Sequence, residues 1–103
     1  MKKIYSTTEL RERLMPIFHD FGIIKAILFG SYGKGIAKEN SDLDLFIDSN
    51  GKIRGIDFFS VRARISDALE MTIDLIEARQ LIKGGKIEKE IFSTGVIIYD
   101  QAG

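Results

Sequence analysis

The sequence predicts one α/β or α+β domain, in which a small mixed β-sheet is flanked by helices. Apolar residues recur at helical spacing between residues 10 and 21, residues 23–29 are almost all apolar, and residues 42–48 have a strand pattern in which every second residue is apolar and three of the other four are aspartates. Helix and strand periods that alternate along a chain are typical of a sheet covered by helices. No internal repeat or linker divides residues 1–103, which favours a single domain.

The first helix is expected to begin after Ser6, because Ser6 and Glu9 form the sequence pattern of a capping box. Its apolar stripe contains Leu10, Leu14, Ile17, Phe18 and Phe21. Pro16 lies inside this stripe and is expected to kink or shorten the helix, while Gly22 favours its end. Residues 23–29 then form a strand that we expect to be buried on both faces.

A polar segment with several glycines, residues 30–41, predicts a loop with room for a short helix. The next strand is expected over residues 42–48. Leu43, Leu45 and Ile47 share one face of it, and Asp42, Asp44, Phe46 and Asp48 share the other. Asn50-Gly51 then predicts a tight turn.

The last part of the chain predicts a helix, a strand, a shorter helix and a final strand. The first of these helices has an apolar stripe of Phe58, Val61, Ile65, Ala68 and Leu69. Residues 72–77 form the third strand. A helix over residues 86–94 is ended by Gly95, and residues 96–99 form the last strand.

The composition excludes several classes of chemistry. The 103 residues contain no cysteine and one histidine, which rules out disulfides, thiol nucleophiles and cysteine-bound metals, so any metal would have oxygen ligands. The 15 basic residues balance the 15 acidic residues, so no overall field attracts nucleic acid or a membrane. The chain shows neither a secretory signal nor an apolar run of about 20 residues, and we expect a cytoplasmic protein.

Asp42 and Asp44 are the first candidate pair for catalysis. Because side chains alternate along a strand, both carboxylates project from one face, with their Cα atoms about 7 Å apart. Two anions this close raise each other's proton affinity unless a cation lies between them. A magnesium ion, held by one or two carboxylates together with substrate phosphates, fits this pattern. The alternative is a solvent-exposed strand face without a ligand.

Gly30, Ser31, Gly33 and Gly35 follow the first strand and indicate a phosphate site. Small residues at such a turn let backbone N–H groups approach a phosphate, and Lys34 adds a positive charge. The alternative is a flexible connecting loop. Neither the G-x-G-x-x-G pattern nor the P-loop is present, because the glycine spacing differs and Lys34 is followed by Gly35.

Together these residues resemble the pattern of one family. Gly30-Ser31, ten further residues and then Asp42-x-Asp44 resemble the signature of the DNA polymerase beta-like nucleotidyltransferase superfamily, and the length resembles its minimal nucleotidyltransferase branch. The resemblance extends over essentially the whole chain. It implies a nucleotidyltransferase fold and a third carboxylate on a later strand, at Asp74.

The resemblance also implies a reaction, the transfer of a nucleoside monophosphate from a triphosphate to a hydroxyl group. ATP is the expected donor, and pyrophosphate is the leaving group. The implied catalytic residues, which would also bind one or two Mg²⁺ ions, are Asp42, Asp44 and Asp74. The implied phosphate-binding residues are Gly30, Ser31 and Lys34.

Larger members of this superfamily carry further domains that bind the acceptor, and 103 residues leave no room for one. The resemblance therefore implies an acceptor on a partner protein, namely an all-helical HEPN ribonuclease toxin. This chain would be the antitoxin of a toxin–antitoxin pair and would adenylylate a tyrosine of the toxin.

A second interpretation is a binding module that neutralises its partner by occlusion, with little or no catalysis. Lys34 stands where the family commonly has arginine, and lysine lacks the bidentate geometry of a guanidinium group. Direct nucleic-acid binding is not expected, because glutamates alternate with the lysines of the last predicted helix.

Overall fold

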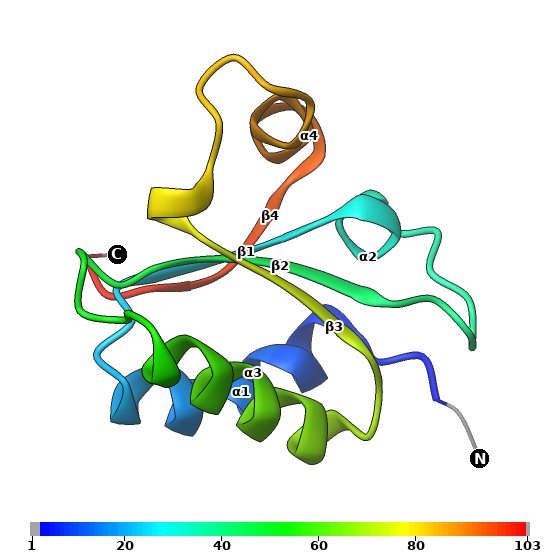
Figure 1. Ribbon diagram of the computed structural model, residues 1–103. Helices are drawn as coiled ribbons and strands as arrows, with labels where there is room; N and C mark the ends of the chain where they lie inside the picture. The colour runs from blue at the N-terminus through cyan, green and yellow to red at the C-terminus, as the bar shows by residue number, and fades with distance from the viewer. Residues whose placement is uncertain (1–2, 103) are drawn as a thin grey trace.

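The computed structural model describes residues 3–102 and shows one sheet with helices on both faces (Figure 1). The elements are α1 (Thr7–Asp20), β1 (Lys25–Phe29), α2 (Gly30–Lys34), β2 (Leu43–Asp48), α3 (Ile56–Leu69), β3 (Ile73–Glu77), a 3₁₀ turn η1 (Ala78–Gln80), α4 (Lys86–Thr94) and β4 (Val96–Asp100). The predicted order of helices and strands is confirmed. The ends of the expected domain, residues 1, 2 and 103, lie outside the described residues.

The four strands lie in the order β3-β2-β1-β4. β1 runs antiparallel to both β2 and β4, whereas β2 and β3 are parallel, so the predicted mixed sheet is confirmed. Because of these directions, the end of β1 and the beginnings of β2 and β3 meet at one edge of the sheet. The residues singled out for chemistry occupy these three strand ends or lie next to them in the chain.

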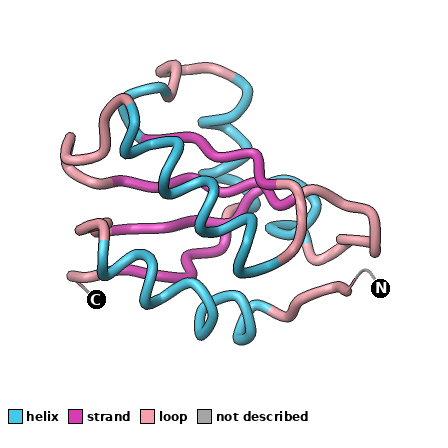
Figure 2. The backbone as a smooth tube through the Cα atoms, turned by 60° about the horizontal axis from the view of Figure 1, so that its bottom comes forward, coloured by secondary structure: helices cyan, strands magenta, loops and turns pink. Residues whose placement is uncertain are grey.

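The main core lies between the sheet and the two long helices, α1 and α3. Figure 2 shows these helices side by side across one face of the sheet. The β2 side chains on this face, Leu43, Leu45 and Ile47, are completely buried. The predicted stripe of α3 packs against them, with Val61, Ile65 and Leu69 buried and Phe58 and Ala68 partly buried.

The opposite face of the sheet has a thinner cover, formed by α2 and α4 (Figure 1). Its core is a small cluster of Phe29, Phe46 and Ile91. Burial along β1 therefore alternates, and Lys25 and Ile27 are only half-buried, so the prediction of a strand buried on both faces is wrong. Asp44 belongs to this thinly covered face, which leaves its carboxylate within reach of a ligand.

Helix α1 begins with the predicted capping box. The backbone N–H of Glu9 donates to Ser6 Oγ at 3.1 Å, and the backbone N–H of Ser6 donates to Glu9 Oε1 at 3.0 Å. Gly22 follows the helix with a φ of +68°, and the backbone N–H of Ile23 donates to the carbonyl of Phe18 at 2.9 Å. This Schellman arrangement confirms Gly22 as the stop signal.

Pro16 does not end the helix. α1 continues to Asp20, so the expected shortening is wrong, although proline removes one N–H from the backbone ladder. Leu14 and Ile17, on either side of Pro16, are buried in the core. Tertiary packing of this apolar face compensates for the missing hydrogen bond.

Replacing Ser6 by alanine should lower the free energy of unfolding by about 1 kcal/mol, because the N–H of Glu9 loses its acceptor. Urea unfolding measures this loss. The control is Thr8→Ala in the first turn of the same helix, an exposed position that we expect to be neutral or stabilising. Equal destabilisation by both changes would contradict a specific role for the cap.

Candidate functional site

The candidate site lies at the edge where β1 ends and where β2 and β3 begin. Asp44 in β2 lies opposite Phe29 at the end of β1 and opposite Asp74 in β3. Three segments that are distant in sequence thus bring Gly30, Asp44 and Asp74 together. Asp42 lies two residues before Asp44 and is exposed, as is Asp74.

Gly30 lies directly against the carboxylate of Asp44. A Cβ atom at position 30 would lie 2.0 Å from Asp44 Oδ2 and 2.9 Å from its Cγ, so the Asp44 side chain would have to move to make room for it. Gly30 also has a φ of +62°, a left-handed conformation that favours glycine. Glycine at position 30 therefore allows the Asp44 carboxylate to lie close to the backbone of the loop.

The predicted loop with a short helix is α2, and its residues serve different purposes. Ser31 is half-buried in the first turn, whereas Lys34 is exposed in the last turn and forms no ion pair within residues 3–102. Gly33 allows close packing, because a Cβ there would lie 2.9 Å from the carbonyl oxygen of Leu28 and 3.0 Å from that of Thr94. The sequence had suggested a phosphate contact for Gly33.

The electrostatics of Asp44 set it apart from the other acids. Its pKa is raised from 3.8 to about 6, first by burial, then by the charge of Asp74 and a hydrogen bond with Asp74, and then by the charges of Asp42 and Glu90. Several negative charges therefore lie close to a partly buried carboxylate. A divalent cation bound among them would reduce their mutual repulsion.

The donor set fits magnesium, which prefers a few carboxylate oxygens together with substrate phosphates. Asp44 and Asp74 lie in register on neighbouring strands. β2 begins at Leu43 and not at the predicted residue 42, so Asp42 directly precedes the strand, close enough for its charge to act on Asp44. In the described part of the chain, however, no group of three or more Asp, Glu, His or Cys residues is arranged as a set of metal ligands. The protein alone therefore offers a partial site that a nucleotide's phosphates would have to complete.

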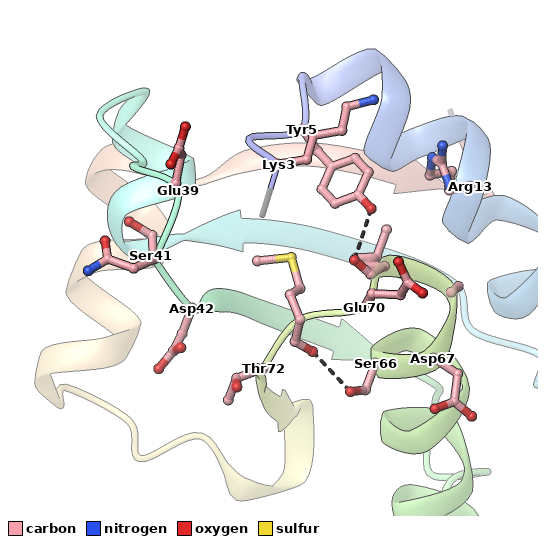
Figure 3. A pocket seen from close by; sticks show the side chains of 14 residues that line it. Lys3, Tyr5, Arg13, Glu39, Ser41, Asp42, Ser66, Asp67, Glu70 and Thr72 are labelled. Atoms are coloured by element: carbon pink, nitrogen blue, oxygen red, sulfur yellow. Dashed lines mark hydrogen bonds between the residues drawn. The ribbon is translucent and has the colours of Figure 1, made fainter. Parts of the chain in front are cut away.

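A cavity of about 1090 Å³ adjoins this edge of the sheet (Figure 3). It lies between the segment before α1, the loop before β2 and the end of α3. Its acidic lining residues are Glu39, Asp42, Asp67 and Glu70, and its basic ones are Lys3 and Arg13. One wall is fixed by Tyr5, whose hydroxyl donates to the carbonyl of Leu69 at 2.9 Å. Asp42 thus belongs both to the acidic cluster and to the border of the cavity.

Two acidic features escaped prediction. Glu90 in α4 acts on Asp44 through the fold, but its sequence context among lysines indicated an ordinary solvated helix. Glu77, at the far end of β3, is 3% exposed and accepts hydrogen bonds from the hydroxyl of Ser49 and the backbone N–H of Arg79. Its carboxylate joins the segment after β2 to η1, which is a structural role.

The raised pKa of Asp44 predicts a pH-dependent stability. The folded state holds the Asp44 proton more tightly than the unfolded state, so its stabilising contribution is complete below pH 3.8 and is lost as the pH rises through about 6. Without magnesium at pH 7.5, Asp44→Asn should therefore be more stable than the wild type, by about 1 kcal/mol after solvent screening. The difference should shrink towards pH 4 in urea titrations.

The control for this measurement is Asp20→Asn, which removes an exposed acid that pairs with Arg64 on the other side of the sheet. It should change stability by less than about 1 kcal/mol at any of these pH values. A stability difference for Asp44→Asn that does not vary with pH would contradict the prediction.

The sequence is similar to a known protein family and to a characterised type of enzyme. The family described as "Polymerase beta, Nucleotidyltransferase" matches residues 12–102. The protein adenylyltransferase MntA of Thermococcus cleftensis is 33% identical over 76 residues, which are 74% of this chain and 70% of that protein. Within residues 3–102, no helix has the length and apolar character needed to cross a bilayer.

Solved structures show the same fold. A toxin–antitoxin structure with AMP-PNP has a TM-score of 0.76 at 20% identity, covering 87% of this chain and 73% of that chain. A structure of a tri-AMPylated Shewanella oneidensis HEPN toxin in complex with an MNT antitoxin has a TM-score of 0.71 at 16% identity, covering 91% and 72% of the two chains.

Proposed function

Because the chain belongs to the polymerase beta nucleotidyltransferase family, as the sequence resemblance had implied, we propose that it transfers AMP from ATP to a hydroxyl group of a partner protein. The observation that carries this proposal is the register of Asp44 opposite Asp74, with Gly30 packed against the Asp44 carboxylate. This arrangement provides carboxylate ligands for a metal ion at one edge of the sheet. At the same edge, it provides a loop backbone that a phosphate group can approach.

The proposed partner is a HEPN ribonuclease toxin, and the proposed acceptor is a tyrosine hydroxyl of that toxin. Two observations support this choice. The relative from Thermococcus cleftensis is named a protein adenylyltransferase, and one structure of the same fold is an MNT antitoxin in complex with an AMPylated HEPN toxin. By analogy, this chain would act as the antitoxin of its pair.

In the proposed reaction, the tyrosine oxygen attacks the α-phosphorus of ATP, and the bond from this phosphorus to the bridging oxygen breaks. Pyrophosphate leaves with the electron pair of that bond. Asp74 is the proposed acceptor of the hydroxyl proton. The backbone and hydroxyl of Ser31, the backbone of Gly30 and the charge of Lys34 bind the outer phosphates.

Asp42, Asp44 and Asp74 are the residues that would hold magnesium. The ion, when bound, supplies charge neutralisation for the triphosphate and for the leaving group. The protein contributes the alignment of the two reactants and the electrostatic stabilisation of the developing charge, and little covalent chemistry is required of it.

The test combines the purified chain with magnesium, labelled ATP and a HEPN toxin from the same genome. We expect label on the toxin, which a chelator should abolish. Absence of label on the toxin in the complete mixture would overturn the proposed activity.

Occlusion of the partner without catalysis is the second candidate function. It is favoured by Lys34, which stands where the family commonly has arginine and lacks the bidentate geometry of a guanidinium group. Toxin neutralisation that survives Asp44→Ala, with unchanged affinity for the toxin, would support occlusion over transfer.

A further inference from the structure

The proposed phosphate-binding residues lie on α2, a helix too short to hold its own position. It has five residues, and its N-cap residue is Phe29, whose apolar side chain cannot cap a helix. A helix of this length is stable only when tertiary contacts support it. The placement of Ser31 and Lys34 against a nucleotide therefore depends on what α2 packs against.

Tyr32 anchors α2 in the main core. Its side chain is 7% exposed and belongs to the same buried cluster as Tyr5 and Leu69, whereas Lys34 in the same helix is exposed. The ring therefore faces the interior of the domain and not the proposed nucleotide site. Any effect of Tyr32 on the nucleotide has to pass through the position of the α2 backbone.

The hydroxyl of Tyr32 takes part in a chain of two hydrogen bonds. It accepts from the backbone N–H of Tyr5 at 3.5 Å, and the hydroxyl of Tyr5 donates to the carbonyl of Leu69 at 2.9 Å. Figure 3 draws the second of these bonds. Leu69 ends α3, and residues 70–72 then lead to β3, which carries Asp74. The two tyrosines thus connect the phosphate loop to the segment before Asp74, although these segments are distant in sequence.

A bound nucleotide spans both segments in the proposed reaction, because α2 binds its outer phosphates while Asp74 accepts the proton of the attacking hydroxyl. Resting on the proposed function, we propose that Tyr32 is a positioning residue, whose buried hydroxyl holds the phosphate-binding backbone of α2 in place relative to Asp74. Phenylalanine at position 32 retains the ring and its packing, but it leaves the N–H of Tyr5 without this acceptor.

The test measures the binding of fluorescently labelled AMP-PNP with magnesium to the purified chain. Tyr32→Phe should weaken this binding by about threefold to tenfold, since the buried hydrogen bond that orients the loop is lost. Tyr5→Phe removes the second bond of the chain and should weaken binding in the same direction. The matched control, Tyr99→Phe, should stay within about twofold of the wild type. Tyr99 pairs with Ala26 near the start of β1, whereas α2 follows the end of that strand.

Kinetics separate positioning from a general effect on folding. A variant that merely folds less completely would lower the apparent kcat through a smaller active fraction, and would leave the KM for ATP unchanged. Tyr32→Phe should instead raise the KM for ATP by about threefold to tenfold and keep kcat within about twofold, because the phosphate contacts exist before the reaction as well as during it. Thermal melts establish that all variants are folded at the assay temperature.

Equal nucleotide binding by the wild type and Tyr32→Phe would contradict a positioning role for Tyr32, and so would an equal loss in Tyr99→Phe. Absence of nucleotide binding by the wild type would also contradict it. Nucleotide binding requires no AMP transfer, so the two proposals fail separately. A wild-type chain that binds the nucleotide without labelling the toxin would refute the transfer, whereas the comparison of binding constants would still decide the role of Tyr32.

Discussion

Replacing Asp44 by asparagine should reduce AMP transfer by about a hundredfold to a thousandfold while leaving the fold intact. Asparagine has nearly the same shape as aspartate, so it can occupy the space against Gly30 and opposite Asp74. It lacks the negative charge that a magnesium ligand requires. The measurement is the initial rate of label transfer to the toxin at saturating ATP and magnesium.

Asp20→Asn is the matched control, because Asp20 lies at the end of α1 on the other side of the sheet. Its activity should stay within about twofold of the wild type. Retention of transfer by Asp44→Asn to within about tenfold would contradict a catalytic role for this carboxylate. The expected loss of activity, together with the gain in stability expected at pH 7.5 without magnesium, would show that the acidic cluster is maintained at a cost to the fold.

Gly30→Ala should be the second severe change, because it affects both the geometry and the stability of the site. The new methyl group would lie 2.0 Å from Asp44 Oδ2, so the carboxylate must move away from the loop and from its position opposite Asp74. We expect transfer to fall by about a hundredfold. The free energy of unfolding should fall by about 2 kcal/mol, from the clash and from the left-handed backbone.

Gly35→Ala separates these two causes. Gly35 also has a positive φ, +74°, but a Cβ atom there would meet nothing within 4 Å. The change should cost about 1 kcal/mol of stability through the backbone alone and leave transfer within about twofold. Equal losses of activity in Gly30→Ala and Gly35→Ala would show that the contact with Asp44 is not the cause.

Local sequence patterns predicted most of the elements. The helix over residues 86–94 and its stop at Gly95 match α4, because capping and helical periodicity depend on neighbouring residues. The alternation in β2 correctly separated the core residues from the face that carries Asp44. Strand boundaries were less accurate, and β1 begins at Lys25 and not at residue 23.

Local sequence patterns did not predict the tertiary contacts of the site. The contact of Gly30 with Asp44 depends on how β1 and β2 pair, and the approach of Glu90 depends on how α4 crosses the sheet. Pro16 is a similar case, since local chemistry predicted a kink or a shorter helix, and α1 nevertheless continues to Asp20 because its apolar face is packed in the core. The family pattern located Asp74 because it carries information about strand pairing that spacing alone lacks.

The parallel pairing of β2 with β3 has a consequence for synthesis on the ribosome. Asp44 is made early, but Asp74 follows only after the whole of α3, and the crossover must fold before the two strands can pair. A nascent chain that has not yet released β3 thus carries Asp42 and Asp44 without Asp74. The acidic cluster can therefore assemble only after β3 has left the ribosome and paired with β2.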